Sequence, residues 1–435
     1  MTPADRYRET LAAVGAPTVH EGPPSRERLS ELELQARIYA GDCGIAWRGE
    51  DGETVEVVHF GSWNREPGPD FCGARVRIDG VEHTGDIEVD PDVRDWENHG
   101  HSRNPHYNRV VLHLFRRRGP RRFFTRTSDH RAVTQVCLTP AAAARPRAAL
   151  PDRGLDGAAA RTLIEAAAQF RFHRKAERFQ RSVRLCGAGD ALFQGIATGL
   201  GYKNNKIPFL LVAQRAGLDR AMARTGEALL FGLAGFLRAE DFTRGDEAAR
   251  RYLRELWENW WTIRDGEARL ILADSAWKFT AVRPANHPHR RMGALAAVAR
   301  SFRRLARCKD PDDFEGILTG LGHGYWSFHY SVAGHPLPRP AALIGAERAR
   351  EITVNTLLPS LPVADGWRLL RELPGAGPNE RVRKALTWIC GTAETDLLRS
   401  ALHQQGLLQL HDDFFPRDAG EIWRAYAKST GRVGD

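Results

Sequence analysis

Four acidic residues on two neighbouring predicted strands are the side chains best placed to do chemistry. The stretch "GPDFCGARVRIDGVEHTGDIEVDPD" (68–92) has Asp70 at the start of one apolar run and Asp86, Glu88 and Asp90 at alternate positions of the next. Residues two apart in a strand point to the same face, so the last three carboxylates share a face. Ionised carboxylates within about 4–6 Å of one another repel, and a hard divalent cation such as Mg²⁺ relieves that repulsion.

Such an ion suits the hydrolysis of phosphodiesters. Bound Mg²⁺ or Mn²⁺ positions and activates a water molecule and offsets charge on the leaving oxygen. We therefore expect Asp70 and Glu88 to be the main metal ligands, with Asp86 as a further ligand and Asp90 as a catalytic side chain. The alternative is a solvated acidic strand face paired with some of the many arginines.

The elements that position these acids are expected in the order helix, strand, strand, strand, helix, strand. Asp79-Gly80 is a strong signal for a hairpin that lays the second acidic run beside the first. Asp70 has the parity of Ala74 and Val76, which predicts that it lies on the apolar, inward face. The expected helices are 25–40 and 91–101, and the expected strands are 53–63, 70–78, 81–89, 108–118 and, pairing back, 121–129.

Beyond residue 138 the character of the sequence changes. An Ala- and Pro-rich stretch (138–154) reads as a linker, and amphipathic helical patterns follow to the end of the chain. The sequence therefore predicts an α+β fold, with a mixed β-sheet flanked by helices and then a mainly α-helical remainder. The predicted division is an α/β domain at 1–145, a helical domain at 155–340 and a C-terminal helical region at 341–435.

The composition narrows the classes of function. The chain has 435 residues and a formal net charge of +9, which permits a nucleic-acid partner. Six scattered cysteines without a C-x-x-C pair are typical of a reducing cytosol. The longest apolar run (228–237) is too short to cross a bilayer, and the first residues lack the apolar core of a signal peptide. We expect a cytoplasmic protein with no membrane partner.

Several basic and histidine side chains are candidates for contacts with a phosphate substrate. His99 and His101 follow the acidic strand and are candidate proton carriers near neutral pH, and the histidines of this region have no recognised zinc spacing. Unspecialised surface charge, and rigid loops capped by Pro and Asn, are the alternatives for the basic residues. The candidate nucleic-acid contacts are Arg116, Arg117, Arg118, Lys203, Lys206, Arg283, Arg290 and Arg291.

The acidic stretch resembles the PD-(D/E)XK nuclease superfamily. Pro69-Asp70 matches its first motif and Glu88 the acid of its second, within the same order of elements. The resemblance implies that these two acids bind Mg²⁺ and that a helix-borne glutamate, here Glu31, sometimes completes the site. In that superfamily a lysine two positions after the second acid assists the attacking water, and Asp90 occupies that position.

A second resemblance covers nearly the whole chain. "EPGPDFCGARVRIDG", "GDIEVDPDVRDWENHGH", "NPHYNRVVLHLF", "LGYKNNKIPF", "EALLFGLAGFL" and "WKFTAVRPANHPHRRMGALA" occur in the order found in the bacterial family of unknown function DUF2851. It implies that family's fold, and its usual strand motif is Glu-x-His where this chain has Asp90. We expect a Mg²⁺-dependent nuclease for DNA or RNA; the alternative is a non-catalytic nucleic-acid-binding protein with a degenerate nuclease core.

Overall fold

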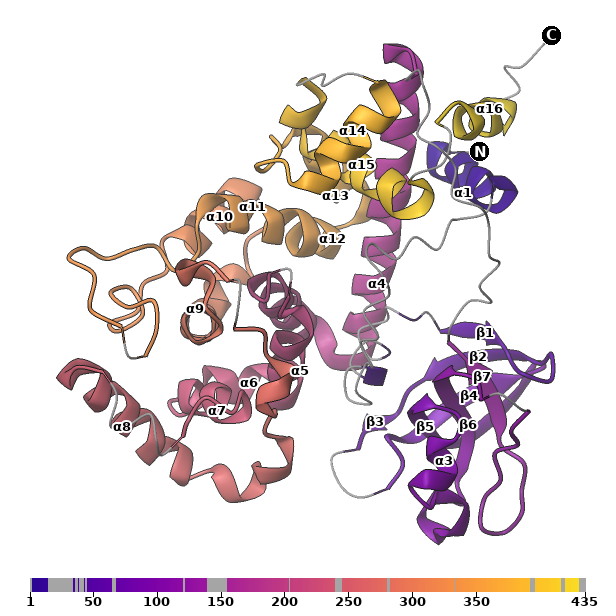
Figure 1. Cartoon of the computed structure of the whole chain (residues 1–435), viewed down its shortest axis with the longest axis horizontal. Helices are drawn as coiled ribbons and strands as arrows, with labels where there is room; N and C mark the ends of the chain where they lie inside the picture. Colours follow the sequence, from indigo (N-terminus) through magenta and orange to yellow (C-terminus); the bar gives the residue numbers. More distant parts are fainter. Residues whose placement is uncertain are drawn as a thin grey trace.

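A mixed β-sheet and a larger helical region make up the protein, which we describe from a computed structural model (Figure 1). The predicted α+β class, with the sheet first and the helices after it, is confirmed. The structure describes residues 2–14, 34–35, 38, 43, 45–64, 68–119, 122–138, 155–202, 204–238, 245–279, 282–332, 334–391, 396–415 and 419–429.

Within the described residues the sheet has seven strands in the order β1-β2-β4-β5-β6-β7, with β3 paired to β4. Its first strands pair antiparallel, whereas β5–β6 and β6–β7 are parallel. The Asp79-Gly80 hairpin is confirmed: both residues have positive φ, 47° and 85°, as the tight turn between β4 and β5 requires. The strands are β1 (Ala46–Arg48), β2 (Thr54–His59), β3 (Ser62–Trp63), β4 (Phe71–Ile78), β5 (Val81–Asp92), β6 (Val110–Arg117) and β7 (Thr134–Cys137).

A bulge in β4 decides which way Asp70 faces. The β4–β5 register shifts between Phe71 and Ala74, and Gly73 between them has φ 69°. Phe71 and Ala74 therefore both enter the core, although they are three positions apart. The predicted parity of Asp70 with Ala74 and Val76 is wrong for this reason. Asp70 precedes Phe71 and lies against Glu88 instead.

The two faces of the sheet carry different side chains. Ile87, Val89, Leu112 and Leu114 pack on one face in an apolar core, to which Leu185 of helix α4 (Gly157–Leu200) adds. On the alternate positions of β5, Glu88 and Asp90 are almost completely buried. That second face is covered by the connection from β5 to β6, whose Trp96 belongs to a small apolar cluster. The acids are thus buried between the sheet and this connection.

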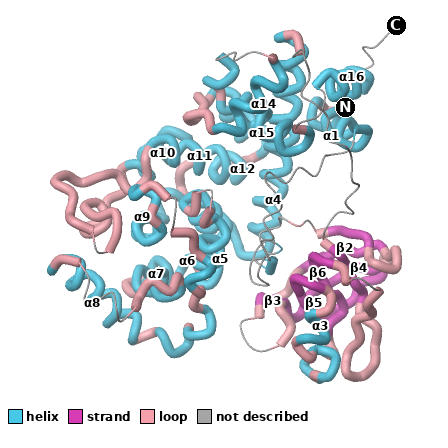
Figure 2. The backbone as a smooth tube through the Cα atoms, viewed as in Figure 1, coloured by secondary structure: helices cyan, strands magenta, loops and turns pink. Residues whose placement is uncertain are grey.

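The β5–β6 connection contains α3 (Asp95–Asn98) and two 3-10 turns, His101–Arg103 and Pro105–Tyr107. Helical structure expected at 91–101 is thus present in shortened form. The expected strand at 121–129 is wrong: Arg126 forms only an isolated bridge with Ala132, and β7 takes its place beside β6. The tube in Figure 2 shows this segment as loop beside the magenta strands.

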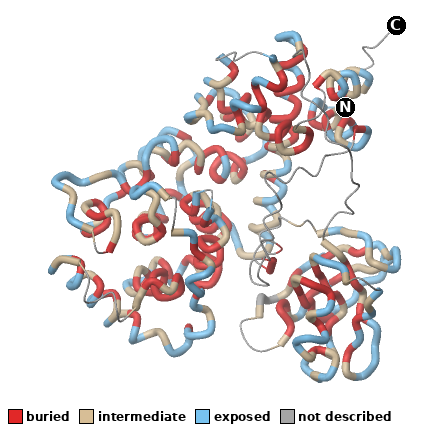
Figure 3. The backbone as a smooth tube through the Cα atoms, in the orientation of Figure 1, coloured by how far each residue is buried: buried red, intermediate tan, exposed pale blue. Residues whose placement is uncertain are grey.

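The helical region is organised around α4, which runs from Gly157 to Leu200 and is interrupted at Gly187 by a non-helical φ of 83°. Figure 3 shows the buried residues concentrated near both ends of α4, in the helices packed around it and in the centre of the sheet, whereas residues 177–190 of α4 are intermediate or exposed. The other helices are α5 (Lys206–Ala216), α6 (Leu218–Met222), α7 (Gly226–Leu233), α8 (Glu247–Trp261), α9 (Pro288–Leu305), α10 (Pro311–Thr319), α11 (Ala346–Ile352), α12 (Leu358–Ser360), α13 (Val363–Glu372), α14 (Glu380–Cys390), α15 (Ala401–Phe414) and α16 (Ala419–Ser429).

The first helix, α1 (Pro3–Val14), packs with this helical region rather than with the sheet. Tyr7 is fully buried, its hydroxyl donates to Asp413 Oδ2 at 2.9 Å, and its ring lies 5.1 Å from that of Phe170. The predicted boundary at residue 145 groups α1 with the sheet, whereas its packing partners are α4, α15 and α16. Among the described residues, no helix is long and apolar enough to cross a membrane.

Candidate metal centre

Asp70 and Glu88, predicted to act together, lie in direct contact at the junction of β4 and β5. The Asp70 main-chain N–H donates to Glu88 Oε2 at 3.2 Å. The Asp70 carboxylate accepts from the Val89 N–H at Oδ2 (2.8 Å) and from Gln35 Nε2 at Oδ1 (2.6 Å). Each Asp70 oxygen therefore accepts at least one N–H, which fixes the orientation of the carboxylate.

Asp86, the predicted additional ligand, sits one alternation earlier on β5 and is buried. Its Oδ1 accepts the Gly73 N–H at 2.9 Å. This bond holds the β4 bulge against β5, so Asp86 stabilises the turn of backbone that directs Asp70 to Glu88. Glu31, the predicted helix-borne ligand, lies outside the described residues. Gln35, which binds Asp70, is helical and comes from the same stretch of sequence.

His101 reaches Glu88 from the β5–β6 connection. Its Nε2 lies 3.1 Å from Glu88 Oε1, and both side chains are buried. The His101 ring stacks on Tyr107, with ring centroids 3.9 Å apart, and meets Trp96 edge-on at 5.5 Å. These rings fix the imidazole, and Glu88 thus contacts the Asp70 amide with one oxygen and His101 with the other.

Asp90 is completely buried and is oriented by a chain of buried polar groups. Gln135 Nε2 donates to Thr125 Oγ1 at 2.7 Å, and Thr125 Oγ1 lies 2.8 Å from His113 Nδ1. Because the hydroxyl oxygen accepts from Gln135, its O–H is left to donate to Nδ1. His113 then carries its proton on Nε2 and donates it to Asp90 Oδ2 at 3.1 Å.

Burial shifts the pKa values of Asp90 and His113 in the directions that favour their uncharged forms. Burial raises the pKa of Asp90 to about 7, although the imidazoles of His101 and His99 act in the opposite direction. Burial, and then repulsion from His101, lowers the pKa of His113 to about 3, so this imidazole is neutral at ordinary pH. Gln35 and Thr125 were not predicted from the sequence, since no local pattern marks them.

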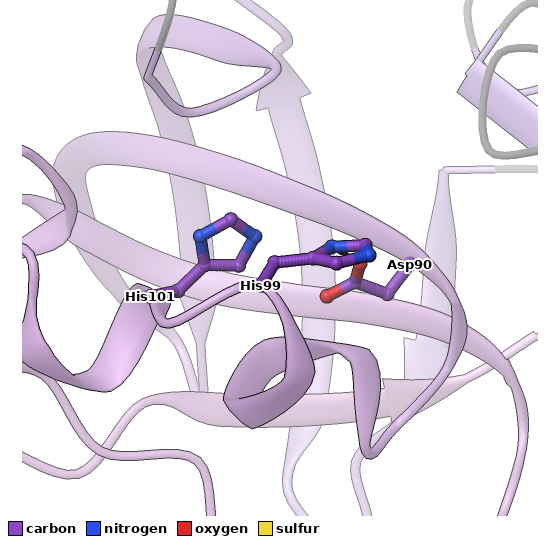
Figure 4. Close-up of side chains that lie close together, drawn as sticks. All are labelled: Asp90, His99 and His101. Atoms are coloured by element: carbon purple, nitrogen blue, oxygen red, sulfur yellow. Dashed lines mark ion pairs between the residues drawn. The ribbon is translucent and has the colours of Figure 1, made fainter.

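Asp90, His99 and His101 form a compact group of donors. One ligand atom from each lies within 4.8 Å of the others, and Figure 4 shows the three side chains together. His99 Nδ1 is 3.4 Å from Asp90 Oδ1, and the His99 side chain is 42% exposed. The predicted lysine position is thus filled by a carboxylate whose charged contacts, in the described part of the chain, are imidazoles.

The predicted nucleic-acid contacts fall into different environments. Arg116 is half-buried, and Arg117 and Arg118 are exposed but pair with carboxylates: Arg117 Nη2 lies 3.5 Å from Asp92, and Arg118 binds Glu50 through Nε and Nη2 at 2.8 and 2.7 Å. Each of these pairs offsets part of the positive charge at the end of β6.

The loop residues of the helical region divide between surface and interior. Lys206 and Arg283 are exposed, and Lys203 lies outside the described residues. Arg290 and Arg291 are buried: Arg290 Nη2 donates to the carbonyl of Ala341 at 2.9 Å, and Arg291 Nη1 to that of Leu343 at 2.8 Å. These two guanidiniums hold the 341–343 segment and do not present themselves to solvent.

Comparison with known proteins identifies one family. Residues 46–139 and 152–370 match the family described as protein of unknown function (DUF2851). The match includes the candidate centre from Asp70 to Gln135, whereas Gln35 lies before the matched residues. No curated protein and no solved structure matches the chain.

Proposed function

This chain belongs to the DUF2851 family, and from its site we propose that it is a divalent-metal-dependent nuclease that hydrolyses phosphodiester bonds of DNA or RNA. Asp70 and Glu88 would hold Mg²⁺ or Mn²⁺. The observation that carries the proposal is the convergence on Glu88, which brings together the start of β4, the middle of β5 and the β5–β6 connection: its two oxygens contact the Asp70 amide and the His101 imidazole.

The donor set suits a hard cation. Mg²⁺ prefers carboxylate oxygens, and ligating carboxylates in metal sites are themselves hydrogen-bonded. Asp70 meets that description, because Gln35 and Val89 each donate to one of its oxygens. The Gln35 side-chain N–H and the Val89 main-chain N–H thus fix the plane of the Asp70 carboxylate before a cation binds. The bound ion would supply Lewis-acid activation of water and charge stabilisation at the leaving oxygen.

The groups around the pair would handle protons and position. His101 faces Glu88 from a rigid aromatic setting, and His99 is open to solvent at the edge of the same group. An imidazole can carry a proton near neutral pH. We assign these two histidines, with Asp90, the part that the lysine plays in the PD-(D/E)XK superfamily.

The order of strands supports the same nuclease-like interpretation. The strands that carry Asp70 and Glu88 are antiparallel neighbours in the middle of the sheet, and a helical connection leads from β5 to a parallel β6. A helical connection that leads from the second acidic strand to a further strand is one part of the predicted helix–strand–strand–strand–helix–strand order. The net charge of +9 favours a polyanionic substrate, and we place the activity in the cytoplasm.

A non-catalytic nucleic-acid-binding protein is the second candidate. Asp90 favours it, because a carboxylate stands where the superfamily has a lysine. Such a protein would keep the fold and the positive charge and would bind nucleic acid with strong dependence on salt.

Cleavage of a mixture of labelled single- and double-stranded DNA and RNA, in Mg²⁺, Mn²⁺ or EDTA, tests the proposal. We expect Asp70→Asn and Glu88→Gln to lose cleavage by roughly 10²-fold or more, as for other oriented catalytic groups. Glu82→Gln is the matched control, because Glu82 lies on the same strand but is exposed and paired with Arg75 at 3.4 Å. Wild-type cleavage that both site variants retain would refute the proposal, and salt-sensitive binding without cleavage would favour the second candidate.

A further inference from the structure

One carboxylate and two imidazoles converge beside the Asp70–Glu88 pair, and this group has the composition of a transition-metal site. Ligand atoms of Asp90, His99 and His101 lie within 4.8 Å of one another. We propose that these three residues bind one Zn²⁺ ion, at a site separate from the carboxylate pair. This inference goes beyond the proposed function, because it is measured as metal binding and does not depend on cleavage.

The geometry is close to what a tetrahedral ion needs. Bonds of about 2.1 Å at tetrahedral angles set neighbouring donor atoms roughly 3.4 Å apart. Asp90 Oδ1 and His99 Nδ1 are already 3.4 Å apart. Asp90 and His101 are buried and form the floor of the site, whereas His99 is exposed and can rotate to complete it. Because the His99 side chain is 42% exposed, an ion can reach the site from its side.

The second, independent observation is a buried oxygen of Asp90 that has no hydrogen-bond donor. Asp90 is 0% exposed, and its Oδ1 accepts no hydrogen bond from any residue that the structure describes. A buried carboxylate oxygen without a donor costs free energy unless a cation meets it. The other oxygen, Oδ2, is hydrogen-bonded to His113 Nε2. One oxygen is thus held by the protein, and the other is directed at the two remaining imidazoles of the group.

The surroundings resemble the outer shell of a metal site. Ligating side chains are usually oriented by hydrogen bonds to carboxylates or other fixed polar groups. His101 has the Glu88 carboxylate 3.1 Å away, and Asp90 has His113, which Thr125 holds in place. The convergence of these contacts on Asp90 and His101, the two buried donors, supports a ligand role.

The donor set selects the class of ion. Imidazole nitrogen suits Zn²⁺ and its neighbours in the first transition row, whereas Mg²⁺ takes oxygen ligands and retains waters. Three protein ligands leave at least one coordination position open, which distinguishes this site from a closed structural zinc site. The open position lies on the side where His99 meets solvent.

The test is a titration of the full-length, metal-free protein with Zn²⁺ in competition with a chromophoric chelator, and with Co²⁺ as a spectroscopic probe of nitrogen ligands. We expect the wild type to bind one Zn²⁺ and His99→Ala to bind it at least tenfold more weakly, since even the loss of an outer-shell partner costs about 10–100-fold. His106→Ala is the matched control, because His106 is an exposed histidine of the same connection and is not part of the donor group.

The outcomes separate this inference from the nuclease proposal. Asp70→Asn should keep the tight Zn²⁺ site whether or not it loses cleavage. Equal affinity of His99→Ala, His106→Ala and wild type would mean adventitious binding and would overturn the inference. So would a wild type that yields no ligand-field absorption with Co²⁺. Because His99 is exposed, its substitution is not expected to unfold the protein, and circular dichroism of each variant verifies this.

Discussion

Replacing the Thr125 hydroxyl tests the polar chain that orients Asp90. Thr125 is 2% exposed, and its Oγ1 is the only link between Gln135 Nε2, at 2.7 Å, and His113 Nδ1, at 2.8 Å, in the described structure. Thr125→Val keeps the shape of the side chain and removes both hydrogen bonds. Two buried polar atoms then lose their partner in a region that water does not reach.

The size of the effect follows from the number of groups left unpaired. Each buried donor or acceptor without a partner costs about 1–3 kcal/mol, so Thr125→Val, which leaves two such groups, should lower the free energy of unfolding by roughly 2–6 kcal/mol. Thr353→Val is the control. Thr353 is also fully buried, but its hydroxyl donates only to the Ala349 carbonyl of its own helical turn, at 3.0 Å. Its loss should cost about 0.5–1.5 kcal/mol.

Urea unfolding followed by circular dichroism measures both variants. A double-mutant cycle with Gln135→Leu sharpens the result, because removing both partners together relieves the unpaired amide. We expect a coupling energy of about 1–2 kcal/mol between Thr125 and Gln135. If Thr125→Val costs no more than Thr353→Val, or if the cycle shows no coupling, the proposed chain of hydrogen bonds to His113 is not formed.

Three further predictions concern backbone, packing and pH. Gly73→Ala should lower the free energy of unfolding in urea by roughly 1–2 kcal/mol, because Gly73 has a φ of 69°, which strains a residue with a Cβ. An added Cβ meets no atom within 4 Å at Gly73 or at Gly266, but Gly266 has no positive φ. Gly266→Ala, the control, should therefore change the free energy of unfolding by less than about 0.5 kcal/mol. Gly293→Ala should cost about 1–3 kcal/mol by the same measurement, because its Cβ would lie 2.0 Å from Trp326 Cδ1. Burial lowers the pKa of His289 to about 3, so the unfolded chain binds its proton first as pH falls below about 6.5 and stability is lost between pH 6.5 and 3. The free energy of unfolding, measured in urea, should therefore fall by roughly 2 kcal/mol less between pH 7 and pH 4.5 in His289→Gln than in the wild type. Equal falls in the two proteins would contradict the low pKa of His289.

Local signals were enough to predict the parts of the fold that depend on neighbouring residues. The β4–β5 hairpin needed only Asp79-Gly80 between two alternating runs, and β6 needed only its apolar stretch. The failed strand at 121–129 shows the limit. Its two phenylalanines resemble strand residues, yet Phe124 is 56% exposed, and the chain turns at His130, which has φ 65°. The strand that forms instead, β7, is chosen by parallel pairing with β6, which no local pattern encodes.

The same distinction applies to the site. The spacing of Asp70 and Glu88 predicted their proximity, and the contact exists, but through a bulge at Gly73 that reverses the expected parity. His99 and His101 were identified as proton carriers by their position after the acidic strand. Their grouping with Asp90 depends on how the β5–β6 connection folds back over the sheet. Sequence spacing of histidines alone could not indicate this site, because its third donor comes from a strand.

Asp90 determines the electrostatic character of the whole centre. A lysine at this position would partly neutralise Asp70 and Glu88, whereas Asp90 adds a further buried carboxyl group, and its charged contacts in the described structure are imidazoles rather than guanidiniums. Burial raises the pKa of Asp90, and the His101 and His99 imidazoles act against that rise, so a bound cation would favour the carboxylate in the same way. On the two proposals, an ion at Asp70–Glu88 and an ion at Asp90–His99–His101 offset different carboxylates. Occupation of either site should therefore leave the other able to bind its own cation.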